Sequence, residues 1–578
     1  MRRTIVTLTM SLLLIGSAVR HAHAQEVRGT VRERVSRLPI SGAVIALLDA
    51  GGKTLGRNIT DEQGRYRIIV SSNTTQLRFI RIGFRPTTVP LNRKGGSVDT
   101  LDVLMTTLPT MLEPMAVTAN GCPRRDDTGP ALGLLEQARA SLLNSVVARE
   151  ANPGRVVRIR FQRRMDGTSD RIAHQSVKID SSARSERPFV SARTGAEFVR
   201  DGFVKDDGGG ATYFAPDADA LLDDAFIAGY CVRLVRGDRG HPTEVGLGFT
   251  AATQSRTRID VDGVLWVDTT QRQLRRLEFR YVGLARSAEP ANPGGQLWFR
   301  DMPNGVVIID RWSLRLPALD PDSLYDNRTA RFTRRDRLYA QESGGEVAHI
   351  AWPSGLAWDA PLGTLALTAL TRSHTPAAGT QVRLEDTDYS GRVDAKGQVT
   401  LNRLLPGPYN LVVIDTALET LAIQLHTRLK FEAVRDSTHR ATVEVSTAND
   451  YVQDRCRHDG IWNAFIPRRP GAVWMIGRAV SSDGLSVDET RASLAEGSAA
   501  KRAKDESSPF ALLASDKEIT STRTGTDGIY ELCQGRFSVG DSVIVTLRAR
   551  DGATVKFPYV LRDSLTVLPM KPFPPRTP

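Results

Sequence analysis

The stretch Thr60-Asp61-Glu62-Gln63-Gly64-Arg65-Tyr66 decides how the first folded segment of this chain is interpreted. An Asp that bonds the backbone two residues on, followed by a Gly at positive φ, makes a tight turn that leads into a strand. On both sides of this turn, apolar and polar residues alternate with a period of two, as in Ile80-Arg81-Ile82-Gly83-Phe84. Short alternating strands bounded by turn residues predict a β-sandwich over residues 29–104.

This pattern, with Gly29-Thr30-Val31 at its start and Pro39-Ile40-Ser41-Gly42 after it, resembles the carboxypeptidase regulatory-like domain, a transthyretin-like sandwich. Such domains accompany zinc carboxypeptidases and precede many TonB-dependent receptors. The resemblance implies a fold and an envelope or extracellular setting, and it supplies no catalytic residue. Residues 112–119 are similar to the segment that joins such a domain to a receptor plug.

The turn motif recurs twice, as Asp394-Ala395-Lys396-Gly397 and as Thr526-Asp527-Gly528-Ile529-Tyr530. We therefore expect a mainly β, multidomain chain in which transthyretin-like or Ig-like β-sandwiches flank a central antiparallel β domain with one or two helices. The expected divisions are a signal peptide, 1–24; the first sandwich, 25–119; the central β-rich domain, 120–353; a second sandwich, 354–446; and a third, 447–578, with a disordered insertion near 496–509.

The first 24 residues predict a secretory signal peptide, with Arg2 and Arg3 before an apolar run at 5–19 and the cleavage motif Ala22-His23-Ala24. No later run approaches the length of a spanning helix, so we expect no transmembrane segment after signal removal. The product is expected in the periplasm, at the outer membrane or outside the cell. Removing the signal lowers the net charge from +12 to +9. Arginines scattered along predicted strands favour solvated sheet faces over a nucleic-acid surface.

The central region combines one amphipathic helix, at 131–149, with several strands. Asn304-Gly305 predicts a hairpin turn between two of the strands. The hairpin at 263–278 is weakly similar to those of periplasmic lipoprotein-carrier half-barrels, a likeness too short to imply lipid transport.

His241-Pro242-Thr243-Glu244 has the H-x-x-E spacing of a zinc-binding pair, and His349 or His374 could complete a third ligand. This pattern keeps a zinc carboxypeptidase-like enzyme as an alternative. A single H-x-x-E is expected by chance in a chain with this composition, and the surrounding β meander differs from the α/β fold of those peptidases. We therefore predict no enzymatic activity, no catalytic residue and no cofactor.

Two acidic clusters have both a structural and a cation-binding interpretation. Asp217, Asp219, Asp223 and Asp224 cluster around the start of a short helix predicted at 219–227, where capping and the helix dipole favour acids. Asp320, Asp322 and Asp326 are expected in a polar loop, because they lack the Gly and the final Glu of a calcium hand.

The four cysteines, Cys122, Cys231, Cys456 and Cys533, form no C-x-x-C motif. In an exported chain their even number predicts two disulfides. Sequence proximity favours Cys122 with Cys231 and Cys456 with Cys533, and the other two pairings stay open.

Trp266, Trp298 and Trp312 fall in successive predicted strands. They are candidates for a ligand platform of the kind that binds sugars, with packing on one hydrophobic face as the alternative. The sequence thus predicts an exported bacterial envelope protein with non-enzymatic binding or structural modules for a protein or polysaccharide partner. The other alternative is a soluble accessory of a TonB-dependent outer-membrane uptake system.

Overall fold

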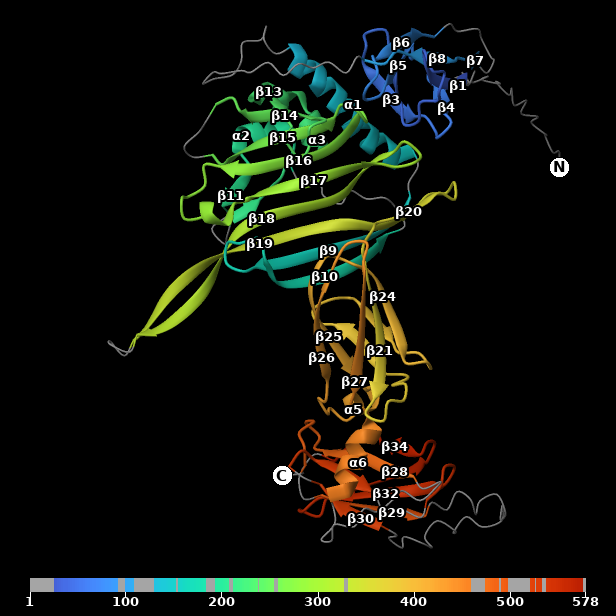
Figure 1. Ribbon diagram of the computed structural model, residues 1–578, viewed down its shortest axis with the longest axis vertical. Helices are drawn as coiled ribbons and strands as arrows, with labels where there is room; N and C mark the ends of the chain where they lie inside the picture. The colour runs from blue at the N-terminus through green and yellow to red at the C-terminus, as the bar shows by residue number, and fades with distance from the viewer. Residues whose placement is uncertain are drawn as a thin grey trace, which may run out of the picture. The chain divides into compact units, whose positions relative to one another are not determined.

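The computed structural model divides the chain into two compact units built mostly of strands (Figure 1), which confirms the mainly β fold class. The first unit comprises residues 1–160, 165–170 and 180–359, and the second comprises 161–164, 171–179 and 360–578. The structure describes residues 25–91, 99–108, 129–151, 154–182, 193–206, 211–237, 239–253, 258–326, 331–458, 473–487, 490–496, 520–524, 526–532 and 537–574. The predicted signal peptide, the segment at 112–119 and all but the first residue of the insertion predicted at 496–509 lie outside these residues.

An N-terminal sandwich of two sheets begins the first unit. One sheet has the order β4-β1-β7, with β8 also paired to β1, and the other has the order β3-β2-β5-β6. The strands are β1 (Gln25–Glu33), β2 (Val44–Leu48), β3 (Thr54–Ile59), β4 (Arg65–Val70), β5 (Gln76–Ile80), β6 (Thr87–Pro90), β7 (Asp99–Thr100) and β8 (Val103–Met105). β4 buries every second side chain, as the alternation in the sequence predicts.

The predicted turn has the expected chemistry. The Asp61 Oδ1 atom accepts hydrogen bonds from the backbone N–H groups of Gln63 and Arg65, at 3.0 and 2.8 Å. Gly64 has a φ of +70°, and a Cβ atom there would lie 2.5 Å from the carbonyl oxygen of Val31. Only glycine fits this position, because both its φ and the close backbone contact exclude a side chain.

The second unit contains two further sandwiches with the same strand order as the first. In each, an opening strand pairs antiparallel with one neighbour and parallel with another, and a second sheet of four strands packs against them. The second sandwich has β21 (Gly363–Thr371), β22 (Gln381–Leu384), β23 (Ser390–Arg392), β24 (Gln398–Leu404), β25 (Gly407–Ile414), β26 (Thr427–Ala433) and β27 (Thr438–Val445), with α5 (Thr416–Thr420). The third has β28 (Trp474–Val480), β29 (Arg491–Glu496), β30 (Thr520–Arg523), β31 (Ile529–Leu532), β32 (Ser542–Arg548), β33 (Thr554–Val560), β34 (Leu565–Val567) and β35 (Lys571–Pro572), after α6 (Ala448–His458).

The turns predicted to repeat in these sandwiches also form. The Asp394 carboxylate accepts from the N–H groups of Lys396 and Gln398, both at 2.8 Å, and Asp527 accepts from Ile529 at 3.0 Å. In each of the three turns an Asp carboxylate accepts from a backbone N–H two residues on, and each turn lies between the third and fourth strands of its sandwich.

A ten-stranded sheet forms the centre, in the order β10-β9-β19-β18-β17-β16-β15-β14-β13, with β20 paired to β19. Its strands are β9 (Arg155–Met165), β10 (Ile172–Ser182), β13 (Tyr230–Arg236), β14 (Glu244–Ala251), β15 (Asp260–Asp268), β16 (Gln273–Val282), β17 (Gly294–Asp301), β18 (Val307–Asp326), β19 (Arg331–Ala351) and β20 (Ala357–Asp359). A two-stranded sheet of β11 (Val204–Asp206) and β12 (Ala211–Tyr213) lies outside it, and the 3-10 helix η2 (Glu289–Ala291) precedes β17.

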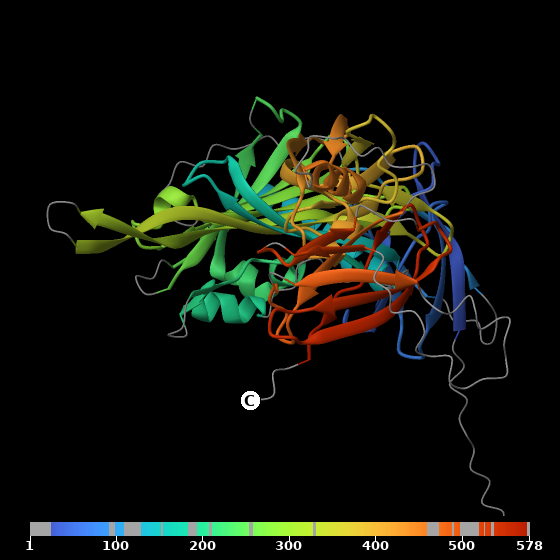
Figure 2. The same ribbon diagram turned by 90° about the horizontal axis from the view of Figure 1, so that it is seen from below.

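The expectation of a polar loop around Asp320, Asp322 and Asp326 was wrong. These residues belong to β18, which continues with β19 as a two-stranded ribbon beyond the part that β17 pairs (Figure 2). In the ribbon they pair with Arg337, Arg335 and Arg331. The three acids therefore belong to a paired strand, where a polar loop was expected.

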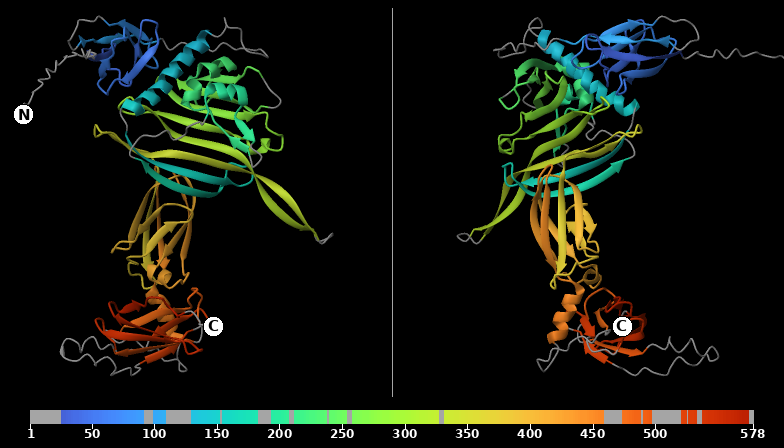
Figure 3. Two further views of the ribbon diagram at one scale, coloured as in Figure 1. Left: turned by 180° about the vertical axis from the view of Figure 1, so that it is seen from behind. Right: turned by 45° about the vertical axis from the view of Figure 1, so that its right-hand side comes forward.

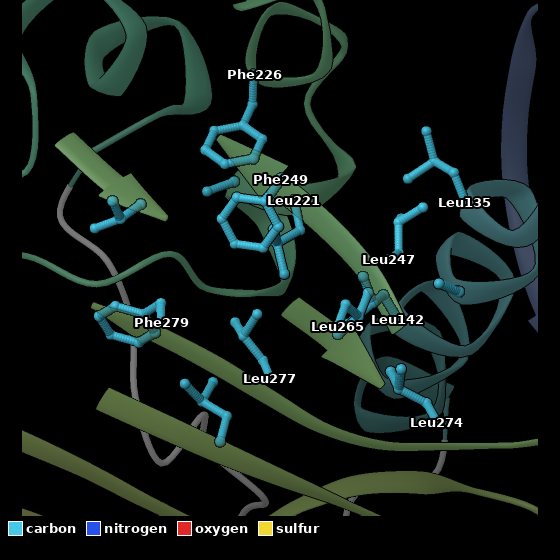
Figure 4. Packing of buried hydrophobic residues seen from close by; sticks show 14 of the residues in the cluster. Leu135, Leu142, Leu221, Phe226, Leu247, Phe249, Leu265, Leu274, Leu277 and Phe279 are labelled. Atoms are coloured by element: carbon cyan, nitrogen blue, oxygen red, sulfur yellow. The ribbon is translucent and has the colours of Figure 1, made fainter. Parts of the chain in front are cut away.

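Four helices cover one face of the central sheet (Figure 2): α1 (Gly129–Ala151), α2 (Gly195–Asp201), α3 (Ala218–Leu222) and α4 (Asp224–Gly229). The helix predicted at 131–149 is α1, while the short helix predicted at 219–227 is divided into α3 and α4. Leucines of α1 and aromatic residues of the strands fill the space between the layers (Figure 4). The apolar cavity left there is only about 20 Å³, about the space of one water molecule. None of the described helices is long and apolar enough to cross a membrane.

α1 also joins the N-terminal sandwich to the central sheet, and it runs between them (Figure 3). The amide of Asn144, 1% exposed, donates to the carbonyl oxygens of Gly42 and Gly305 and accepts from the N–H of Val307. A buried ion pair of 3.0 Å between Arg81 and Asp301 lies at the same junction. The sandwich is therefore fixed to the sheet by buried polar contacts.

Candidate binding face of the central sheet

Strand pairing gives the central sheet one apolar face and one polar face. Residues that pair directly across antiparallel strands lie on the same side of a sheet. The apolar face carries the row Leu247, Leu265, Leu277, Leu297 and Trp312, packed against α1. The adjacent row, one residue further along each strand, is Gly246, Trp266, Arg276, Trp298 and Arg311. We call the side of this second row the polar face.

Tryptophan and arginine alternate along the second row. The Arg276 guanidinium lies 5.0 Å from the centre of the Trp266 ring, and that of Arg311 lies 4.6 Å from the centre of the Trp298 ring. The Trp266 Nε1–H donates to the Glu278 carboxylate at 3.0 Å. These cation–π contacts and the hydrogen bond order the side chains, and they leave Trp266 only 9% exposed.

A hollow of about 710 Å³ lies on the polar face beside this row, within the size range of small-molecule sites. Gly294 lies in the register between Arg280 and Arg315, and a Cβ atom there would lie 2.3 Å from the carbonyl oxygen of Phe279. Polar side chains of seven strands line the hollow: Arg233, Thr250, Asp262, Glu278, Arg280, Gln296, Ser313, Arg315 and Glu342. The lining therefore alternates hydrogen-bond donors with carboxylate acceptors.

Two of the arginines in the hollow are held in place by neighbours. Arg280 binds Asp262 at 3.2 Å. Arg315 binds Asp170 at 2.6 Å and donates to the carbonyl oxygens of Thr168 and Ser169, in the turn between β9 and β10, at 2.7 and 2.9 Å. Arg280 is the freer of the two, because its side chain is 69% exposed.

A second hollow, of about 340 Å³, lies on the other side of the row and is lined largely by ion-paired side chains. Arg300 donates to Asp310 at 2.6 Å, and Arg276 binds the buried Glu244. Burial raises the pKa of the Asp301 carboxyl, and the guanidinium of Arg81 opposes that rise. Charges of both signs therefore line this hollow.

The structure assigns Glu244 of the H-x-x-E motif to one of these ion pairs. Its partner, Arg276, repels any cation that would bind the same carboxylate. His349 hydrogen-bonds Asp359 at 2.9 Å, and His374 lies in a turn of the second unit with a φ of +57°. In the described part of the chain, no three His, Cys, Asp or Glu side chains are grouped to hold a metal.

Two of the acids near α3 and α4 cap these helices, and the side chain of Asp219 lies outside the described residues. The Asp217 carboxylate accepts from the N–H of Ala220 at the start of α3, and Asp223 accepts from Ala225 at the start of α4, both at 2.9 Å. Asp224 binds Arg139 of α1 at 2.8 Å. These contacts support the capping interpretation of the cluster.

The three tryptophans do not form one platform. Trp266 and Trp298 lie on the polar face, whereas Trp312 lies on the apolar face among the core side chains. A β-bulge causes the difference: Trp298 pairs with Arg311 and Phe299 pairs with Ile309, so Asp310 is the extra residue. One inserted residue turns every later side chain of the strand to the opposite face.

Cys231, in β13, is disulfide-bonded. Cys122 and Cys533 lie outside the described residues, as does the side chain of Cys456. The pairing of Cys122 with Cys231, and of Cys456 with Cys533, therefore stays a prediction.

Sequence reasoning missed Asn144, Arg280 and Arg315. Asn144 lies in the middle of a helix, where a buried amide has no local sequence signature. The two arginines lie in strands that the sequence identifies only by their alternation of apolar and polar residues. The strand register, which the sequence does not give, determines that both arginines face one hollow. A usable signal did exist in Asn292-Pro293-Gly294-Gly295, because paired glycines within a strand indicate a close approach or a hollow.

Residues 26–106 match the model of the carboxypeptidase regulatory-like domain. This segment is a carboxypeptidase regulatory-like domain. The match confirms the resemblance of the first sandwich and covers no other part of the chain. No curated protein matches the sequence.

Several solved structures share partial likeness with the chain. The TIE protein of Bacillus anthracis is 9% identical over 72% of this chain and 83% of that one, with a TM-score of 0.14. The major pilin subunit of Bacillus cereus is 11% identical over 73% and 99%, with a TM-score of 0.14. A streptococcal ancillary pilin is 12% identical over 49% and 81%, with a TM-score of 0.15. Likeness at these scores carries no argument about this chain.

Proposed function

We propose that the protein is a non-enzymatic binding protein of the bacterial envelope that takes a segment of polysaccharide on the polar face of its central sheet. The hollow of about 710 Å³ is the observation that supports this proposal. Its lining offers arginine and amide donors beside carboxylate acceptors. A hydroxyl-rich ligand needs both, because each sugar hydroxyl donates and accepts.

The Arg280 side chain is the contact that we expect to matter most, because it lines the hollow and is 69% exposed. A glycan array of purified protein should identify a bound polysaccharide, and calorimetry should then compare Arg280→Ala and Gln296→Ala with the native chain. Loss of a hydrogen bond to a charged group weakens binding by about tenfold or more. The matched control is Arg67→Ala, which removes an equally exposed, ion-paired arginine of the N-terminal sandwich.

Unchanged glycan binding in both hollow variants would exclude the hollow as the site. Binding of a protein and of no glycan would replace the polysaccharide with a protein partner. The envelope location rests on the signal-peptide pattern, and cell fractionation tests it. Firm co-purification with outer-membrane receptors would favour the accessory role in uptake.

We also infer that the second and third sandwiches are diverged copies of the regulatory-like domain. Their strand order and their Asp–Gly turns support this inference. They serve as spacers or further binding modules in the proposed protein.

A further inference from the structure

Residues 33–38 form a rigid finger at one end of the N-terminal sandwich. The N–H of Glu33 donates to the carbonyl of Leu38 at 2.9 Å, and the N–H of Arg37 donates back to the carbonyl of Glu33 at 3.1 Å. The N–H of Arg34 donates to the carbonyl of Met105 at 2.9 Å, and the Glu33 carboxylate accepts from the N–H of Ser36. With its backbone groups bonded in this way, the finger presents its side chains in one fixed arrangement.

Two large aliphatic side chains project from this finger into solvent. Val35 is 84% exposed and Leu38 is 66% exposed, although the N-terminal sandwich beneath them buries a full apolar core. A tight turn ordinarily carries polar side chains at such positions. The fixed backbone prevents either residue from folding back onto the sandwich, so both are available to a partner.

Arginines surround the two aliphatic residues. Arg32, Arg34 and Arg37 are all exposed, and Arg32 donates to the carbonyl of Arg37 at 3.1 Å. Glu33, the acid of the finger, is buried beneath it with its carboxylate bound to a backbone N–H. On the adjacent turn, Asp61 is bound by Arg65 at 2.9 Å, and Glu62 is exposed. The tip is therefore apolar at its apex and cationic around it.

We propose that this finger docks the protein on an anionic phospholipid bilayer. Val35 and Leu38 enter the boundary between headgroups and acyl chains, while the arginine guanidinium groups stay at the level of the phosphates. Basic side chains gain attraction from an anionic leaflet, and the small convex tip needs no complementary pocket. This surface lies on the first sandwich and is independent of the ligand hollow.

Co-sedimentation of the full chain with vesicles tests the proposal. We expect binding to vesicles of equal parts phosphatidylglycerol and phosphatidylcholine, little binding to phosphatidylcholine alone, and weaker binding at high salt. Val35→Ser combined with Leu38→Ser should weaken binding by about tenfold or more, because each exposed aliphatic group loses its burial in the bilayer. The melting temperature should stay unchanged, because both side chains are exposed in the free protein.

Leu485→Ser is the matched control, since Leu485 has the same 66% exposure and lies in a turn of the third sandwich beside Asp483. It should bind vesicles as the native chain does. The proposal fails if the native chain does not bind the anionic vesicles, or if it binds neutral vesicles equally well. It also fails if the double variant binds vesicles like the native chain, or if Leu485→Ser loses as much binding as the double variant. Native-like vesicle binding by the double variant, together with capture of a protein partner at the finger, would assign the finger to that partner.

Discussion

Asn144 is the residue whose replacement should most sharply separate the N-terminal sandwich from the central sheet. Its amide makes three hydrogen bonds, to Gly42, Gly305 and Val307, in a site 1% exposed to solvent. Two of these bonds lead to the hairpin turn that starts β18, and one leads to the sandwich. Asn144→Ala removes all three bonds. It leaves the Gly42 carbonyl and the Val307 N–H without their partner, and the Gly305 carbonyl keeps only the 3.5 Å hydrogen bond from Arg81.

The expected cost follows from the number of orphaned groups. Each buried polar group left without a hydrogen bond costs about 1–3 kcal/mol, and a small cavity adds to this. We expect Asn144→Ala to destabilise the junction by about 4 kcal/mol. Since 1.4 kcal/mol corresponds to a factor of about ten, protection of the junction amides should fall by about a thousandfold.

Hydrogen exchange followed by mass spectrometry on the full chain measures this loss locally. Faster exchange is expected in peptides that cover β2 and the start of β18, and exchange in the second unit should stay unchanged. Asn144→Asp is a second test variant. It keeps the shape of the side chain and replaces the amide donor with an oxygen that faces two carbonyl groups. It should be at least as damaging as alanine if hydrogen bonding, rather than volume, holds the junction.

Asn58→Ala is the control, because the Asn58 amide makes only local contacts within the N-terminal sandwich: it donates an exposed hydrogen bond to the carbonyl of Arg67 at 3.2 Å and accepts from the N–H of the next residue, Ile59, at 2.6 Å. It should cost well under about 1 kcal/mol. A loss of under about 1 kcal/mol for Asn144→Ala, or a native-like Asn144→Asp, would refute the role assigned to this amide.

Three further outcomes are expected. Burial raises the pKa of Asp301 above its usual 3.8, against the opposing effect of Arg81, so ionisation of this carboxyl removes stability as the pH rises just above 3.8. Urea titrations should therefore show the stability of the native chain, relative to Asp301→Asn, falling over that window. A rise in relative stability would contradict the assignment. Glu244→Gln should destabilise the central sheet by about 2 kcal/mol, because Arg276 loses a buried carboxylate partner. Denaturant unfolding measures this loss, and an unchanged unfolding midpoint would show that the ion pair contributes nothing to stability. Elemental analysis should find no stoichiometric zinc, since Arg276 already binds Glu244; zinc that is lost in His241→Ala would restore the peptidase alternative.

The sandwiches were predictable because their information is local. Asp61 and Gly64 specify a turn within four residues, and the same pair of residue types at Asp394 and Gly397 specifies the same turn again. The period-two alternation then assigns inside and outside on the strands that follow. The junction at Asn144 could not be predicted, because its partners lie 102 and 161 residues away in the sequence and become neighbours only when both layers have folded.

The polar face shows why alternation alone does not locate a site in a sheet. From the turn at Asn304 and Gly305, a strand without irregularities would pair Trp298 with Asp310, and Trp312 would then share the face of Trp298. The bulge at Asp310 shifts the register by one residue, so Arg311 takes the position beside Trp298 and Trp312 enters the core. Asp310 is itself 4% exposed, and the half-exposed Arg300 donates to its carboxylate at 2.6 Å, so an ion pair holds the inserted residue. The same shift places Ser313 and Arg315 on the polar face, where they line the hollow. The bulge therefore separates Trp312 from the other two tryptophans of the predicted platform, and it also places two lining residues of the proposed binding site on the polar face.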